Sequence, residues 1–173
     1  MNRAKIELAG GCLLAASIAL ATVHPWGNPR SGSERGAPVL QGSNVPEDVR
    51  QVLEKKCGDC HSANTHYPLY TRLAPVSWMI ERDVHEGRSA FDMSDWQDYT
   101  ADNQISLLTR IGSESRSGEM PLKQYLLFHP GNRLTPQEQE LIYSWTKAER
   151  KRVRLQASGS PDKPGLQSRK EKP

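Results

Sequence analysis

Cys57-Gly58-Asp59-Cys60-His61 reads CxxCH, a spacing typical of the attachment site of a c-type haem. Two thiols at this spacing can each form a thioether bond to a haem vinyl group, and the adjacent imidazole then lies under the iron as an axial ligand. The sequence therefore predicts one covalently bound haem c per chain, attached through Cys57 and Cys60, with His61 as a metal ligand. Because haem carries redox chemistry that the protein tunes, the motif bears on both fold and function.

The chain around this motif has the pattern of a small all-α domain. Only 36% of its 173 residues are hydrophobic, so a large flat cofactor would supply apolar surface that the sequence lacks. Apolar residues recur at helical spacing, and no stretch alternates like a half-buried strand for more than a few residues. Thr135-Pro136-Gln137-Glu138 is a capping box with proline at the first helical position, which marks the start of the last helix. The predicted helices cover 46–57, 75–86 (stopping at Gly87), 100–116, 122–128 and 136–154.

The sequence divides into four segments: a signal sequence or membrane anchor (1–23), a linker (24–43), a c-type haem-binding domain (44–150) and a disordered basic tail (151–173). In the first, Arg3 and Lys5 precede an almost wholly apolar stretch from Leu8 to Val23. We expect this N-terminal hydrophobic helix to place the domain on the periplasmic or equivalent extracytoplasmic side, tethered to the cytoplasmic membrane. The alternative is cleavage after Ala21, which leaves a soluble domain.

Charge is unevenly distributed along the chain. Residues 44–146 contain ten Lys/Arg and fifteen Asp/Glu, a net charge of −5, whereas residues 147–173 contain nine basic and three acidic residues, a net charge of +6. An acidic domain with a basic tail argues against a nucleic-acid binder. We expect redox partner proteins, membrane contact through the N-terminal segment, and a monomer.

An electron carrier usually takes a second axial ligand from the protein. Met120 stands in a Gly-Glu-Met-Pro segment at 118–121, where the proline stiffens the loop and the soft thioether favours ferrous iron. Met79 falls on an apolar helical stripe, so core packing explains it, and Met93 lies in an undistinguished turn. His66 is too close to His61 in sequence to reach the other haem face easily. His85, near the end of a helix that passes the haem, is the alternative sixth ligand.

With these motifs in this order, the chain resembles the small haem-binding-domain family of exported monohaem c-type cytochromes, over roughly 23–147. The resemblance implies a cytochrome-c-like helical domain around one haem, often tethered by an N-terminal anchor. One departure is Leu122, where members commonly have a second proline. The motifs are CxxCHS at 57–62, HYP at 66–68 with Tyr70, APVSW at 74–78, DVHEGR at 83–88, SDW at 94–96, GEMP at 118–121, Tyr125, HP at 129–130, LT at 134–135 and Trp145.

Two further residues, and an acceptor for His61, are candidates for the haem surroundings. Trp78 is expected to line the haem crevice, with ordinary core packing as the alternative. Arg88 is the preferred partner of a haem propionate, because a guanidinium fork suits a carboxylate. The ring N–H of His61 needs an acceptor, for which a backbone carbonyl near Pro68 or Pro75 is the candidate.

Three functions compete on this evidence. The first is an electron carrier, not an enzyme, with six-coordinate iron. The second is a haem enzyme or a gas or redox sensor with an open or labile sixth position, for example a peroxidase-like activity with His85 on the distal side. The third is a zinc or redox-dithiol site built on Cys57, Cys60 and either His61 or His66, although the sequence offers neither a clear fourth ligand nor a βαβ context.

Overall fold

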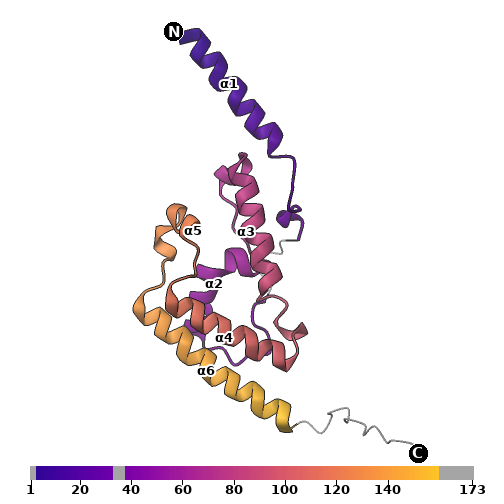
Figure 1. Cartoon of the computed structure of the whole chain (residues 1–173), viewed down its shortest axis with the longest axis vertical. Coiled ribbons are helices and arrows are strands. Elements are labelled where there is room, and N and C mark those ends of the chain that lie inside the picture. The colour runs from indigo at the N-terminus through magenta and orange to yellow at the C-terminus, as the bar shows by residue number, and fades with distance from the viewer. Residues whose placement is uncertain (1–2, 33–37, 160–173) are drawn as a thin grey trace, which may run out of the picture.

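The computed structural model describes residues 3–32 and 38–159 (Figure 1). All regular secondary structure in these ranges is helical, so the predicted all-α class is confirmed. The α-helices are α1 (Arg3–Leu20), α2 (Glu47–His61), α3 (Val76–Ala90), α4 (Ala101–Ser117), α5 (Lys123–Phe128) and α6 (Pro136–Gly159). The 3-10 turns are η1 (Pro29–Gly32), η2 (Leu69–Arg72), η3 (Trp96–Asp98) and η4 (Pro130–Asn132).

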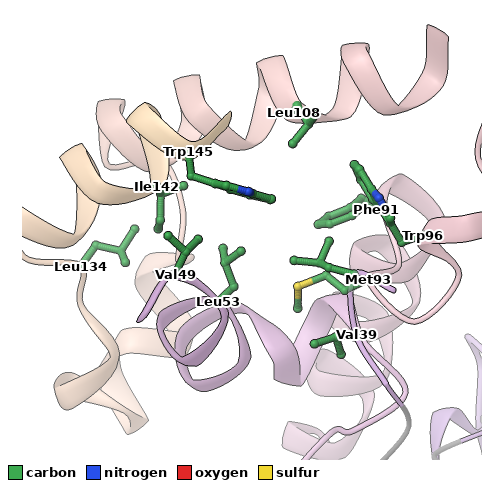
Figure 2. Packing of buried hydrophobic residues seen from close by; sticks show 11 residues of the cluster. Val39, Val49, Leu53, Phe91, Met93, Trp96, Leu108, Leu134, Ile142 and Trp145 are labelled. Carbon is green, nitrogen blue, oxygen red and sulfur yellow. The ribbon is translucent and has the colours of Figure 1, made fainter. Parts of the chain in front are cut away.

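The core lies between α2 and the two helices α4 and α6, which pack side by side (Figures 1 and 2). Gly112 of α4 permits this approach, because a Cβ there would lie 2.6 Å from Thr146 Oγ1 on α6. The indole of Trp145 is buried and donates a hydrogen bond from Nε1 to the Asn44 carbonyl at 3.1 Å. The buried cluster draws on all three helices, on the 38–43 and 91–96 segments and on the residue that precedes the capping box of α6: Val39, Leu40, Val49, Leu53, Phe91, Met93, Trp96, Leu108, Leu134, Ile142 and Trp145.

Helix ends follow the sequence signals in part. The capping box of α6 is confirmed, since Thr135 Oγ1 accepts from the Glu138 amide at 3.2 Å and Glu138 Oε2 accepts from the Thr135 amide at 2.8 Å. The predicted stop at Gly87 is wrong, because α3 continues through it to Ala90. Gly87 serves a close contact between helices rather than a helix end.

Described parts of the 24–43 segment, which the sequence predicts as a linker, contact the domain. Val39 and Leu40 are buried in the core, and the Leu40 amide donates to the Met93 carbonyl at 2.8 Å. Nearer its start, His24 Nδ1 lies 2.6 Å from Glu81 Oε1 on α3. Val39 and Leu40 are adjacent apolar residues in a segment otherwise rich in proline and glycine. Their burial holds residues 38–43 against the domain.

The N-terminal helix α1 extends away from the body of the molecule and buries none of its residues (Figure 1). Its Ser17 hydroxyl donates to the Ala74 carbonyl at 2.7 Å, just before α3. Across the described ranges, the chain contains no helix that is both long and apolar enough to cross a membrane.

At the other end of the chain, α6 continues to Gly159, so the tail is not disordered from 151 as predicted. Val153 is buried against the core, and Arg152 donates to the buried Glu149 carboxylate at 2.8 Å, which together extend the helix. Residues 160–173 of the predicted tail lie outside the described residues.

Candidate functional site

A cavity of about 270 Å³ lies between α2, α3, α4 and the segment that leads into α5. The cysteines and histidine of the CxxCH motif line one side of it, and Met120 lines it from the segment after α4. Its remaining walls are largely apolar, with Leu53, Ala90, Phe91, Leu107, Ile111, Pro121 and Leu122 among them. Two distant parts of the sequence therefore bring their candidate haem ligands to one cavity.

The orientation of His61 is set by its hydrogen bond to the backbone. Its Nδ1 lies 3.0 Å from the Phe91 carbonyl, so Nδ1–H donates to that oxygen and the lone pair of Nε2 stays available to a metal. The His61 carbonyl in turn accepts from the Met93 amide at 2.7 Å. The acceptor is thus the Phe91 carbonyl that follows α3, which corrects the expected carbonyl near Pro68 or Pro75.

The two cysteines are free thiols that are partly buried. Burial raises the pKa of both the Cys57 and the Cys60 thiol to about 12, and the neighbouring Asp59 carboxylate adds to the effect on Cys60. A redox dithiol needs a thiolate near neutral pH, so this environment disfavours that interpretation. Among the described residues, no group of three or more His, Cys, Asp or Glu side chains is arranged to hold a metal ion.

Helix α3 forms the cavity wall next to Cys60, and Gly87 permits the close approach of α3 to Cys60. A Cβ at residue 87 would lie 2.5 Å from the Cys60 carbonyl oxygen and 3.0 Å from the Cys60 Cβ. The missing side chain lets the backbone of α3 rest directly on the CxxCH turn.

Met120 lies in a short segment that directly follows α4. Helix α4 ends at Gly118, whose φ of 75° is the left-handed conformation that favours glycine at a helix C-terminus. The Met120 amide then donates to the Glu114 carbonyl at 3.4 Å, and the buried Pro121 follows. Met93, by contrast, is fully buried in the core, and Met79 lies on α3 outside the cavity. Within the described ranges, Met120 is the methionine that lines the cavity.

Three predicted site residues on α3 do not line the cavity. The helix presents residues 83, 86, 87 and 90 to it, a spacing that defines one helical face. His85 falls on the opposite face and is exposed, so the structure does not support it as a distal ligand. Trp78 also points away, and its Nε1 donates to the Val23 carbonyl at 2.9 Å.

Arg88 does not line the cavity and instead hydrogen-bonds to the chain just after the CxxCH motif. Its Nε donates to the Ser62 carbonyl at 3.1 Å, one of its amino groups donates to Thr65 Oγ1 at 3.0 Å, and the other donates to the Pro29 carbonyl at 3.3 Å. These contacts occupy its guanidinium, and its role as a propionate partner stays a prediction.

Sequence reasoning missed two cationic residues that do line the cavity, Lys56 and Arg110. Lys56 is buried, and its ammonium donates to Glu138 Oε2 at 2.7 Å and to the Arg133 carbonyl at 2.8 Å. Arg110 is exposed and pairs with Glu114 at 3.3 Å. The spacing offered a signal for Arg110, which stands beside the inward residues Leu107 and Ile111 on α4.

A family model described as a haem-binding domain matches residues 15–148. The chain belongs to this haem-binding-domain family. The match contains every residue that lines the cavity and confirms the resemblance inferred from the motifs. No curated protein and no solved structure matches the chain.

The residues of this haem-binding domain fit a c-type haem. The cavity combines two thiols at the required spacing, an imidazole whose Nε2 lone pair is available, a thioether and apolar walls. Glu86, Ala90 and Arg110 line the cavity and are exposed, so it opens to solvent beside them, and Arg110 is the exposed one of the two cations that line it.

Proposed function

We propose that this haem-binding domain is an exported monohaem c-type cytochrome that transfers electrons, with one haem attached through Cys57 and Cys60 and ligated by His61 and Met120. The observation that carries the proposal is that CxxCH and the Gly-Glu-Met-Pro segment line one largely apolar cavity. When bound, the haem supplies the one-electron cycle between ferric and ferrous iron.

The residues of the chain have distinct roles in this proposal. The Phe91 carbonyl holds the imidazole of His61 in the tautomer that ligates through Nε2 and raises its basicity. The segment between Gly118 and Pro121 presents the Met120 sulfur, whose softness favours the ferrous state. Leu107 and Ile111 keep water from the face of the site that α4 covers.

The carboxylates at the cavity indicate the kind of redox partner. Asp83, Glu86 and Glu114 line it, Glu86 is largely exposed, and the domain carries a net charge of −5 over residues 44–146. We propose that the protein docks with a redox partner through a basic patch on that partner. Such contacts are small, weak and steered by charge, so the association rate should fall as ionic strength rises.

The proposal includes a location outside the cytoplasm. It rests on the basic and apolar pattern of residues 3–23 and on an α1 that buries no side chain. We propose that α1 tethers the domain to the membrane, with cleavage after Ala21 as the alternative. Fractionation of the cells, with mass spectrometry of the purified N-terminus, separates these two forms.

Spectroscopy of Met120→Ala tests the ligation. The wild-type protein should stain for haem after denaturing electrophoresis and show the near-infrared thioether-to-iron charge-transfer band. Met120→Ala should keep the stain and lose the band, whereas Met79→Ala, outside the cavity, should keep both. A band that survives in Met120→Ala refutes the assignment of this ligand. High-spin iron and tight CO binding in the wild-type protein would favour an enzyme or sensor with an open sixth position.

A further inference from the structure

Asp59, between the two cysteines, is tied into the structure by both its carboxylate and its backbone. Its Oδ1 accepts from the His66 amide at 2.9 Å, and its Oδ2 accepts from the Tyr125 hydroxyl at 2.7 Å. The Asp59 carbonyl also accepts from Thr65 Oγ1 at 2.6 Å. One of the two residues that the motif leaves unspecified therefore connects the CxxCH turn to α5.

The hydroxyl of Tyr125 both donates and accepts a hydrogen bond. It donates to Asp59 and accepts from Asn132 Nδ2 at 2.6 Å, and its ring stacks on His129 with centroids 4.3 Å apart. Burial raises the pKa of Tyr125 first, and the hydrogen bond to Asp59 raises it further, so the phenol stays protonated as a donor. Asp59 and Tyr125 both line the haem cavity.

The sequence separation makes this hydrogen bond relevant to Met120. Tyr125 lies five residues after Met120, within the six-residue helix α5. Before Met120, the segment is anchored to α4 through the Glu114 carbonyl. After it, α5 reaches α2 and α3 through two side-chain contacts, Tyr125 to Asp59 and the weaker Gln124 Nε2 to Asp83 Oδ2 at 3.4 Å. The Tyr125 contact thus joins the Met120 side of the cavity to the CxxCH side.

We propose that Tyr125 and Asp59 are positioning residues for the sixth ligand, holding the Met120 segment at the cavity so that its sulfur competes successfully with exogenous ligands. The proposal rests on the His61/Met120 ligation proposed above. A hydrogen bond to a carboxylate is among the stronger ones in proteins, so its loss should be measurable at Met120.

The test is an imidazole titration of the purified, haem-loaded ferric protein, followed at the thioether-to-iron band. Tyr125→Phe removes only the hydroxyl, and with it the hydrogen bonds to Asp59 and from Asn132, and should raise the apparent imidazole affinity about tenfold while the haem stays attached. Tyr70→Phe is the matched control, because it removes a tyrosine hydroxyl that bonds His129 Nε2 at 3.1 Å outside the haem cavity. Its imidazole affinity should equal that of the wild type. Asn132→Ala leaves the Tyr125–Asp59 pair present but weakly oriented, and should give a smaller increase in the same direction.

The outcomes separate this inference from the proposed function. If the wild-type protein lacks the band and Met120→Ala has an unchanged spectrum, the ligation and the positioning role both fall. If the wild type has the band but Tyr125→Phe and Asn132→Ala both bind imidazole as the wild type does, the positioning role alone is overturned. Equal increases in Tyr125→Phe and Tyr70→Phe would also overturn it, since a general loosening of α5 would then account for the effect.

Discussion

Replacing Gly87 by alanine tests whether contact between α3 and the CxxCH turn shapes the haem cavity. The new Cβ would start 2.5 Å from the Cys60 carbonyl oxygen, whereas ordinary van der Waals contact begins at 3.4 Å. Helix α3 must therefore move by about 0.9 Å relative to α2, because the obstacle is backbone and cannot rotate away. This movement displaces Glu86 and Ala90, which line the same cavity.

Two opposing terms set the magnitude. Alanine inside a helix is more favourable than glycine by about 1 kcal/mol. Overpacking of a close contact costs about 1–3 kcal/mol, and contact with immobile backbone lies toward the upper end of that range. We therefore expect Gly87→Ala to lower the free energy of unfolding by about 1–2 kcal/mol, and to lower the fraction of chains that carry covalent haem because Cys60 is displaced.

Urea unfolding of the haem-loaded protein measures the first effect, and haem per chain after denaturing electrophoresis measures the second. Gly58→Ala is the matched control, since it is also in a helix and beside Cys57 but its Cβ would meet Ser62 Oγ at an ordinary 3.6 Å. The control should be neutral or slightly more stable than the wild type, with normal haem content. A Gly87→Ala protein that is as stable as Gly58→Ala and equally loaded would show that the interhelical contact is not limiting, and the reasoning would fail.

Two further predictions concern the packing around the site. Gly112→Ala places a Cβ 2.6 Å from the Thr146 hydroxyl at the crossing of α4 and α6, so urea unfolding should show a loss of about 1–2 kcal/mol with haem content unchanged per folded chain. Glu138→Gln keeps the capping box but leaves the buried Lys56 ammonium unpaired, which should cost about 3 kcal/mol near neutral pH. Burial raises the pKa of Glu138, but hydrogen bonds from Lys56 and Thr135 outweigh burial and lower the pKa below its ordinary value of 4.5. The stabilisation from the Lys56–Glu138 pair is therefore present above about pH 4.5 and is lost as the pH falls and Glu138 is protonated. The difference between Glu138→Gln and the wild type should therefore shrink as urea unfolding is repeated from about pH 6 to pH 3; a constant difference would contradict the ion pair's role.

The sequence predicted those features that depend on local chemistry. CxxCH identified the cysteines and the histidine because their spacing is set by the cofactor rather than by the fold. The capping box located the start of α6 because Thr135 and Glu138 satisfy each other's backbone within one turn. Met120 was found from its short segment, although its place on the same cavity as His61 required the structure.

The remaining features depend on the rotation of α3 about its axis. Gly87 looked like a helix stop because glycine often ends helices, but only the tertiary approach of Cys60 shows why glycine is needed there. Arg88 and Trp78 have the chemistry of haem-crevice residues, yet both lie off the face that lines the cavity. The Phe91 carbonyl has no side-chain signature at all, since any residue supplies the same acceptor.

These residues also explain why the rotation of α3 matters for the site. One face of the helix lines the cavity through residues 83, 86, 87 and 90, and the carbonyl just beyond its end orients His61. Arg88, on a different face of α3, donates hydrogen bonds to the Ser62 carbonyl and the Thr65 hydroxyl. These bonds restrain the chain that follows His61. A rotation by one residue, about 100°, would turn Gly87 away from Cys60 and bring a side chain into that contact. The same rotation would move the Arg88 guanidinium away from Ser62 and Thr65, which follow the CxxCH motif. One rotational position of α3 therefore sets the cavity wall, the orientation of His61 and the position of the chain after His61. The close contact between Gly87 and Cys60 selects that rotational position.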